Sequence, residues 1–140
     1  MYHQRKYLDM NAIVQRYSSH QQAERLFFKM KWPSTYICRR CGCCHYVVLT
    51  HEDGYVYECR SCHFQESIVA YTVMEGIDAT LTEWIYVMFL EYVTSQSLSL
   101  EVLSCLSGVD GKRLQWMRSI IASSQLKQIA RLLAEGRFRE

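Results

Sequence analysis

The sequence lacks a hydrophobic run long enough to cross a membrane. Its longest apolar stretch covers residues 84–90, whereas a transmembrane helix needs about 20 apolar residues. The first residues lead into no apolar run either, so we find no secretory signal. These absences argue against a membrane protein. We expect a cytoplasmic protein, whose reduced cysteines are available for metal binding.

Charge of one sign is not in excess. The formal net charge is +2 over 140 residues, which does not by itself indicate a nucleic-acid partner. Basic residues do gather locally, so any nucleic-acid hypothesis must rest on where they lie. The two groups are Lys29, Lys31, Arg39 and Arg40, and then Lys112, Arg113 and Arg118.

The sequence also lacks the residue patterns of common catalytic sites. We find no glycine-rich phosphate loop and no Ser/His/Asp or Cys/His set. The four aspartates, Asp9, Asp53, Asp78 and Asp110, are not spaced to share a metal ion. We therefore expect no enzymatic centre and no small-molecule substrate. With 49% hydrophobic residues, the chain is nevertheless expected to fold, as one ordinary domain or two very small ones.

Local patterns in the first half predict one helix and a small sheet. The first segment runs over about residues 9–30, and its helix is expected to start at Ser18 or Ser19 as the N-cap. The only proline, Pro33, closes this helix. Strands are expected at residues 46–50, 55–59 and 67–71. The sequence His51-Glu52-Asp53-Gly54 predicts the turn of a hairpin between the first two strands.

The second half is predicted to be helical. Thr80 or Thr82 can cap a helix with a broad apolar face, and a turn at residues 107–111 precedes a last helix that begins near Lys112. The apolar spacing allows this last helix to continue through Leu133. In the short helix before the turn, the residues available for burial are Leu100, Val102, Leu103 and Leu106.

Seven cysteines are many for this length, and four of them form two C-x-x-C pairs, Cys38/Cys41 and Cys59/Cys62. The pairs flank the predicted hairpin, which would bring them together. Four thiolates saturate the tetrahedral coordination of zinc and leave no open position. We therefore predict one structural Zn²⁺ site. Gly42, directly after Cys41, fits a zinc knuckle, in which a side chain would obstruct the turn.

Other assignments of these residues remain open. Cys41 and Cys44 are also separated by two residues, and His45 or His63 could replace a sulfur ligand. Free core cysteines or a redox pair are alternatives for a single C-x-x-C. The roles of Cys43 and Cys44 are undetermined, and Cys105 is expected to pack on the apolar side of its helix.

The helical segment has the layout of a helix-turn-helix: a short helix, a turn containing Gly108, and a helix that begins with basic residues. In such a unit the start of the second helix meets base edges, and lysine, arginine and glutamine can read them. The alternative is an ordinary three-helix bundle whose charges face water. The residues that would contact DNA are Asp110, Lys112, Arg113, Gln115 and Arg118.

The order of these motifs resembles the N-terminal region of bacterial insertion-sequence transposases of the DDE type, in which a zinc ribbon precedes a helix-turn-helix. The resemblance covers residues 18–122. Tyr71, Arg39 and the pair Gln115-Trp116 depart from the family pattern. The motifs that carry it are Lys31-Trp32-Pro33, Cys38-x-x-Cys41-Gly42, Cys59-x-x-Cys62, Ser67, Thr72, Leu81-x-x-Trp84, Gly108-Val109 and Lys112.

The resemblance implies a small α+β protein: a three-stranded zinc ribbon flanked by an N-terminal helix and a helix-turn-helix-like unit. The expected segments are residues 1–35, 36–75 and 76–140. In that family the catalytic domain lies downstream, whereas this sequence stops at Glu140. We therefore expect either a fragment or a transposase front end that works alone.

Two functional hypotheses follow. The first is a zinc-dependent protein that binds double-stranded DNA, as a regulator or a transposase remnant. The second is a protein-interaction module, an inhibitor or adaptor of a nucleic-acid enzyme in a mobile element or phage, with a protein partner or a second copy bound. Ten tyrosines and three tryptophans support the second, because aromatic residues are enriched at interfaces. The DNA contacts of the first would be Arg39, Arg40, Lys112, Arg113, Gln115 and Arg118.

Overall fold

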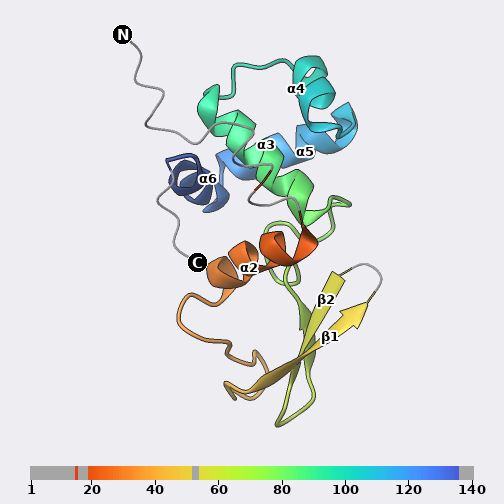
Figure 1. Ribbon diagram of the computed structural model, residues 1–140, viewed down its shortest axis with the longest axis vertical. Helices are drawn as coiled ribbons and strands as arrows, with labels where there is room; N and C mark the ends of the chain where they lie inside the picture. The colour runs from red at the N-terminus through yellow and green to blue at the C-terminus, as the bar shows by residue number, and fades with distance from the viewer. Residues whose placement is uncertain (1–14, 16–18, 52–53, 136–140) are drawn as a thin grey trace. The chain divides into compact units, whose positions relative to one another are not determined.

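The computed structural model describes residue 15 and residues 19–51 and 54–135. The chain divides into two compact units, which are described separately below: residues 24–75, called the ribbon unit, and residues 76–140 together with 1–23, called the helical unit. In the described residues, the elements are a helix, a three-stranded antiparallel sheet and four further helices (Figure 1). The predicted small α+β fold is confirmed.

The sheet of the ribbon unit has the strand order β1-β2-β3. β1 (Tyr46–His51) and β2 (Gly54–Cys59) form an antiparallel hairpin in which Tyr46 pairs with Cys59 and His51 pairs with Gly54. The predicted hairpin is therefore present, although its turn residues Glu52 and Asp53 lie outside the described part of the chain.

The third strand is shorter and lies earlier than the sequence predicts. β3 covers Gln65–Ser67, not residues 67–71. The carbonyl oxygens of Ser67 and Ala70 accept hydrogen bonds from the Nζ of Lys31 at 2.7 and 2.6 Å, so they are not available to a neighbouring strand. Tyr71 then takes a positive φ of 60°, which an extended strand does not contain.

The N-terminal helix α2 (His20–Lys31) ends two residues before Pro33. At its start the N–H of Gln22 donates to the Oγ of Ser19 at 3.2 Å, which is the N-cap contact predicted for Ser19. Ser18 and the earlier part of the first segment lie outside the described residues, apart from Gln15.

An aromatic cluster joins the end of this helix to the hairpin. Neighbouring ring centroids in the cluster lie 4.9–5.7 Å apart and the rings are mostly tilted, an arrangement that aromatic pairs favour. The cluster gives the ribbon unit a small core beside the cysteines. Its members are Phe28, Trp32, Tyr36, Tyr46 and Tyr57.

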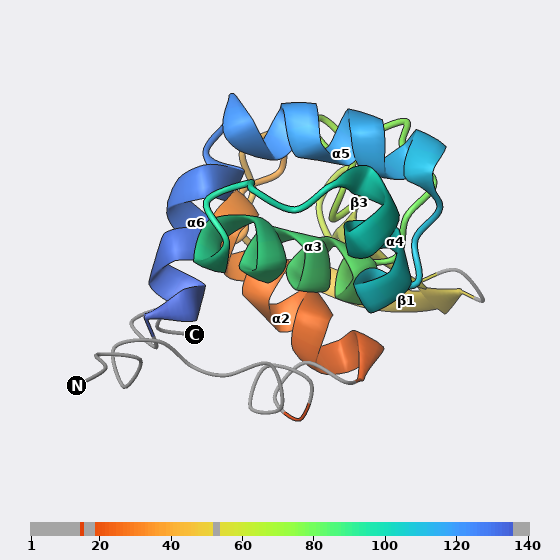
Figure 2. The ribbon, with the colours of Figure 1, turned by 90° about the horizontal axis from the view of Figure 1, so that it is seen from above.

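The helical unit contains α3 (Leu81–Val93), α4 (Leu100–Ser107), α5 (Gly111–Ala122) and α6 (Leu126–Ala134). α3 contacts each of the other three helices (Figure 2). Thr80 is the N-cap of α3 and forms a capping box with Glu83, which decides between the two predicted caps. Among the described residues, no helix combines the length and apolar character needed to span a bilayer.

The last predicted helix is in fact two helices. α5 ends at Ala122 and α6 starts at Leu126. The apolar spacing is the same on both sides, although the helix is interrupted between these residues. The serine hydroxyls explain the break, because they bond the backbone locally. The Oγ of Ser123 donates to the carbonyl of Ser119 at 2.9 Å, and the Oγ of Ser124 accepts the N–H of Leu126 at 3.2 Å.

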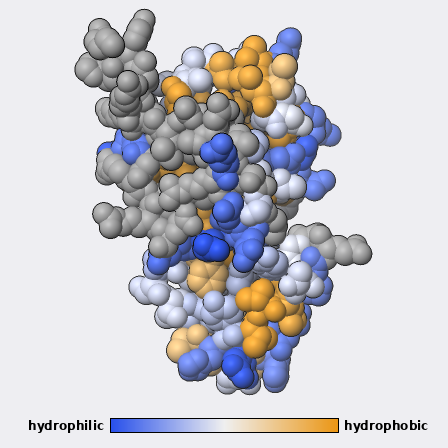
Figure 3. All heavy atoms as spheres, viewed as in Figure 1, coloured by the Kyte–Doolittle hydropathy of each residue, from blue (hydrophilic) through white to orange (hydrophobic). Residues whose placement is uncertain are grey.

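The burial expected for α4 is largely wrong. Leu103 is buried, but Val102 and Leu106 are 46% and 55% exposed. Cys105 is exposed as well, so its expected packing role is also wrong. Figure 3 shows hydrophobic residues gathered on the surface over α4. The short helix therefore buries one side only and leaves an apolar face in solvent.

Candidate metal centre

The four predicted zinc ligands lie together. The sulfurs of Cys38, Cys41, Cys59 and Cys62 are all within 4.8 Å of one another. The Cys38 and Cys62 sulfurs are 3.6 Å apart, and the Cys41 and Cys59 sulfurs 3.5 Å apart. Four sulfurs at about 2.3 Å from one zinc ion would be about 3.8 Å apart. The sulfur positions therefore fit a tetrahedral Zn²⁺ site, and this donor set leaves no coordination position for a substrate.

Two short loops with the same hydrogen bonds build this site. In the first loop the N–H of Gly42 donates to the carbonyl of Cys38 at 2.9 Å, and in the second the N–H of His63 donates to the carbonyl of Cys59, also at 2.9 Å. Each loop therefore curls around its own pair of thiols. β1 and β2 then bring the loops together, because Tyr46 pairs with Cys59 across the hairpin.

The reason for Gly42 differs from the predicted one. A Cβ built at this position meets no atom within 4 Å, so space is not limiting; the φ of +80° is what favours glycine. The equivalent residue of the second loop, His63, has a φ of 66°. The second loop therefore accepts a conformation that is unfavourable for a residue with a side chain.

Replacement of Gly42 tests this explanation. We expect Gly42→Ala to destabilise the zinc-bound ribbon by about 1–2 kcal/mol, because alanine disfavours the left-handed conformation. The control is Gly111→Ala, at the start of α5, where a Cβ also meets nothing within 4 Å and φ is not positive. We expect this control to be neutral or stabilising. Competition with a chromophoric chelator measures the zinc affinity, and equal affinities of Gly42→Ala and the parent would contradict the explanation.

Backbone N–H groups favour ionised sulfur at two of the ligands. The N–H groups of Cys62 and Ser61 lower the pKa of the Cys59 thiol to about 6, although burial opposes this. For Cys38, burial acts to raise the pKa of the thiol. The N–H groups of Cys41 and Arg40, which lie 3.5 and 3.4 Å from its sulfur, outweigh this effect, so the pKa of Cys38 is lowered overall. Zinc binds the thiolate form, so these N–H groups prepare both sulfurs for the metal.

The Cys41 thiol shows why a cation is needed. The N–H of Cys43 acts to lower the pKa of Cys41, but hydrogen bonds to the neighbouring sulfurs, that of Cys59 first, raise it to about 12. The neighbouring sulfurs therefore oppose ionisation of Cys41. A divalent cation removes this conflict, because it stabilises all four negative sulfurs together.

The alternative ligands lie outside the cluster. In the described part of the chain, the four cysteines are the group of metal-ligating residues close enough to share an ion. The Sγ of Cys43 accepts the N–H of His45 at 3.4 Å, and the Nδ1 of His63 lies 3.2 Å from a carboxylate oxygen of Glu58. Cys44 is exposed. The register that pairs Cys38 with Cys41 is therefore the one that the fold assembles.

A buried ion pair beside the site was not predicted from the sequence. The Nζ of Lys31 lies 2.6 Å from Glu66, with side-chain exposures of 4% and 1%, and it also donates to two backbone carbonyls. Burial lowers the pKa of Lys31, and the contact with Glu66 opposes this. Lys31 therefore fastens the end of α2 to β3 and the following turn. The sequence groups Lys31 with other basic residues, but its side chain is buried and is not part of an exposed basic surface.

The knuckles carry three exposed arginines, Arg39, Arg40 and Arg60. The guanidinium of Arg39 lies 4.2 Å from the ring centre of Tyr71, and that of Arg40 lies 5.7 Å from the ring of Phe64. Arg40 also donates to the carbonyl of Cys62 at 2.7 Å. Each arginine stands between two ligand cysteines in the sequence, so the metal site fixes its backbone. Arg60 was not among the predicted contacts, although its place between Cys59 and Cys62 matches that of Arg39.

The predicted DNA-reading residues of α5 divide into two kinds. Lys112 and Gln115 are exposed. Arg113 instead bonds the carboxylates of Asp110 and Glu83 at 2.7 and 3.2 Å. The guanidinium of Arg118 makes two bonds to Glu91, at 2.6 and 3.0 Å, and the Glu91 side chain is only 1% exposed. The two arginines therefore hold the helical unit together, and the exposed residues are free to meet a partner.

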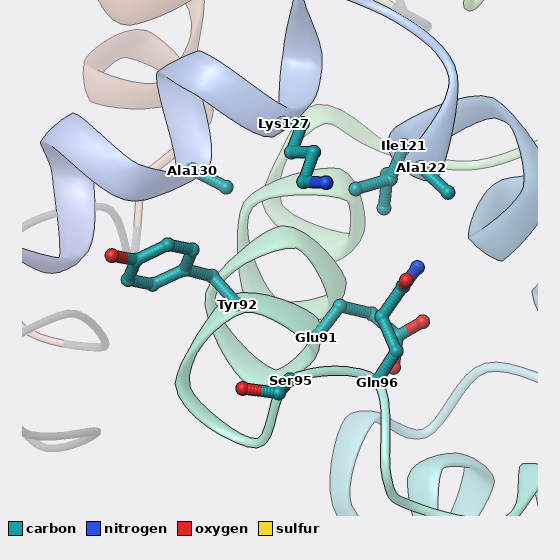
Figure 4. Close-up of a pocket in the computed structure, with 8 residues that line it drawn as sticks. All are labelled: Glu91, Tyr92, Ser95, Gln96, Ile121, Ala122, Lys127 and Ala130. Atoms are coloured by element: carbon teal, nitrogen blue, oxygen red, sulfur yellow. The ribbon is translucent and has the colours of Figure 1, made fainter.

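A pocket of about 240 Å³ lies within the helical unit (Figure 4). Lys127 and Tyr92 line it, together with Ser95 and Gln96, which have positive φ angles of 52° and 60°. Its carboxylate, Glu91, is held by the ion pair described above. We assign the pocket no chemistry. Its remaining lining residues are Ile121, Ala122 and Ala130.

Comparison with known families agrees with this geometry. Residues 18–65 match the family model described as the transposase zinc-ribbon domain. The match spans α2, both knuckles and the hairpin, and it ends at the start of β3. No curated protein and no solved structure matches the chain.

Proposed function

We propose that this chain, whose residues 18–65 match the transposase zinc-ribbon domain and whose four cysteines lie together, is a zinc-dependent protein that binds double-stranded DNA. Its role is that of a transposase DNA-recognition region, acting as a regulator or remnant. We propose binding without catalysis, because a site closed by four cysteines leaves zinc no position for a substrate.

One observation carries this proposal: three exposed arginines stand between the ligand cysteines of both knuckles. Arg39 and Arg40 are further oriented by aromatic rings beneath them. Guanidinium groups held in this way can donate to phosphate oxygens with little loss of side-chain entropy. In this proposal zinc binding determines whether the cationic surface exists, since the metal fixes the loops that carry the arginines.

The helical unit adds a second contact in the proposal. α4 and α5 are joined by residues 108–110, with Gly108 in the left-handed conformation at a φ of 78°, which suits a helix-turn-helix. Lys112 and Gln115 would then reach base edges, because they are exposed near the start of α5. Arg113 and Arg118 would act indirectly by holding that helix in place.

The salt dependence of binding tests the role of the knuckles. Each phosphate contact contributes a slope of about −0.9 to the logarithm of the binding constant against the logarithm of salt concentration. We expect the variant Arg39→Ala/Arg40→Ala/Arg60→Ala to bind random duplex DNA more weakly and with a shallower slope. Fluorescence anisotropy over a salt series measures both quantities.

The control removes the same charge elsewhere. Arg25→Ala/Lys29→Ala/Lys127→Ala replaces three exposed cations outside the knuckles, and we expect it to keep most of the parental slope. Zinc content is measured for both variants, so that loss of the fold is distinguished from loss of contacts. Equal effects of the two triple variants would show that only net charge matters and would refute a specific knuckle surface.

A protein-interaction module is the second candidate function. The exposed apolar residues favour it: Val102 and Leu106 on α4, and Trp116 on α5, which is 63% exposed. Surfaces of this kind are frequently protein interfaces. Failure to shift any duplex at low salt, with a protein partner recovered by the parent and lost by Leu106→Glu, would decide for this function.

A further inference from the structure

The outer edge of the zinc ribbon is an unpaired strand. β1 lies at the end of the strand order β1-β2-β3, and among the described residues no strand pairs with its other side (Figure 1). An open strand presents a row of backbone N–H and C=O groups that another strand can bind. This edge takes no part in the zinc site or in the knuckle surface proposed above.

The register shows which backbone groups face outward. In an antiparallel pair, alternate residues direct both their N–H and C=O toward the partner strand. The N–H of Arg60 donates to the carbonyl of His45 at 3.0 Å. The backbone N–H and C=O groups of His45 therefore point toward β2, and by alternation so do those of Val47 and Leu49. The backbone N–H and C=O groups of the alternate residues point away from β2. These residues, called the outward residues below, are Tyr46, Val48 and Thr50.

The side chains of this edge carry none of the features that usually prevent pairing. Residues 46–50 are Tyr-Val-Val-Leu-Thr, without a charge, a proline or a glycine, whereas natural edge strands are commonly protected by lysine, proline or a bulge. Val47 and Val48 are 37% and 45% exposed. Figure 3 shows hydrophobic residues gathered over β1.

The opposite edge of the sheet is protected. β3 has only three residues, Gln65–Ser67, and the carbonyl of Ser67 is already bound by Lys31. Glu66, in the middle of β3, is buried in its ion pair with Lys31. One edge of the sheet is therefore open and the other closed, so pairing through the open edge ends after one partner.

We propose that β1 binds β1 of a second copy of this chain, antiparallel and around a two-fold axis at Val48. The three outward residues are symmetric about Val48, so Val48 lies opposite its counterpart and Tyr46 lies opposite Thr50 of the other copy. Every outward N–H then meets a C=O. Aromatic and β-branched cross-strand neighbours favour this register, and no like charges meet. The result is one continuous six-stranded sheet across the dimer.

A second copy fits this edge better than an unrelated peptide. A peptide would have to supply an uncharged strand in the matching register, whereas a second β1 supplies it by symmetry. The interface is small, because it consists of one strand from each copy, so we expect a weak dimer that forms with rising concentration.

Sedimentation velocity of the zinc-loaded full chain over a concentration series tests the proposal. The 16.6 kDa chain is expected to shift from monomer to dimer. Val48→Lys places two ammonium groups opposite each other at the axis, and we expect it to weaken the dimer about tenfold or more. Val47→Lys is the control: it adds the same charge at a similarly exposed residue, but the two copies of this lysine are not opposite each other, so dimerisation should persist.

Amide exchange gives a readout that is specific to the edge. In the parent, the N–H groups of Tyr46, Val48 and Thr50 should become protected as the dimer forms, whereas those of Val47 and Leu49 are protected at all concentrations. A parent that stays monomeric at millimolar concentration overturns the proposal. So does a dimer that Val48→Lys leaves intact, or one that Leu106→Glu on α4 disrupts instead.

Discussion

Removal of zinc is expected to unfold the ribbon unit. Structural zinc contributes on the order of 10 kcal/mol or more of apparent binding free energy, and the small aromatic cluster beside the site cannot replace it. Cys59→Ser should have the same effect, because Cys59 supplies a fully buried ligand and lies in register with Tyr46 at the base of the hairpin. The measurement is the dispersion of β1 and β2 amide signals by NMR, with tryptophan fluorescence reporting exposure of Trp32.

The matched controls are the cysteines that lie outside the cluster. Cys44→Ser and Cys105→Ser change exposed thiols, and both variants should retain one zinc ion per chain by elemental analysis. The described residues of the helical unit contribute no ligand to the site, so the helical content of this unit is the internal reference in the same samples. Native hairpin signals that survive chelation would contradict the metal's role in folding.

Loss of Arg118 is expected to destabilise the helical unit strongly. Arg118→Met leaves the carboxylate of Glu91 buried without its partner, and breaking a buried ion pair in this way costs about 3–5 kcal/mol. It also frees the carbonyl of Leu98, to which the Nη2 of Arg118 donates at 2.5 Å. Chemical denaturation, followed by circular dichroism, measures the free energy of unfolding.

A double variant separates the cost of the unpaired charge from that of lost packing. Arg118→Met/Glu91→Leu removes both charges, and apolar replacements of buried ion pairs are frequently neutral or stabilising, so most of the stability should return. Lys112→Ala, at an exposed residue of the same helix, should stay within about 0.5 kcal/mol of the parent. If Arg118→Met were as stable as Lys112→Ala, Arg118 would be free for DNA after all.

These stability results bear directly on how DNA-binding variants are interpreted. A reduced affinity of an Arg113 or Arg118 variant does not identify a DNA contact, because both side chains hold other residues of the helical unit. Lys112 and Gln115 are the informative positions on α5. Their variants should change binding without changing the free energy of unfolding.

Much of the metal site could be predicted because its chemistry depends on short-range spacing. Two residues between cysteines allow one turn to hold both sulfurs, and the Asp-Gly signal between two β-favouring runs brings two such turns together. The choice between Cys41/Cys44 and Cys38/Cys41 needed the register of the hairpin. The reason for Gly42 needed its backbone dihedral, since spacing alone does not distinguish a crowded turn from one with positive φ.

The sequence was less informative where a residue serves a distant partner. Lys31 and Glu66 are 35 residues apart, and so a local pattern assigns Lys31 to a basic cluster although it is buried. The third strand was misplaced for the same reason, because the carbonyls of Ser67 and Ala70 bind Lys31. The apolar residues of α4 were all expected to be buried. A helical pattern shows which residues are apolar, but it does not show which of them pack against a neighbouring helix.

By itself, the sequence determined the hairpin, the two C-x-x-C pairs that flank it and the likeness to a transposase zinc ribbon, since these depend on residue types at short spacings. Only the tertiary structure decided that Arg113 and Arg118 hold the helical unit while Arg39 pairs with Glu66 at the knuckles. It also decided which apolar side of α4 stays in solvent and which edge of the sheet is open. These properties depend on contacts between residues far apart in the chain, and no local pattern encodes the partner.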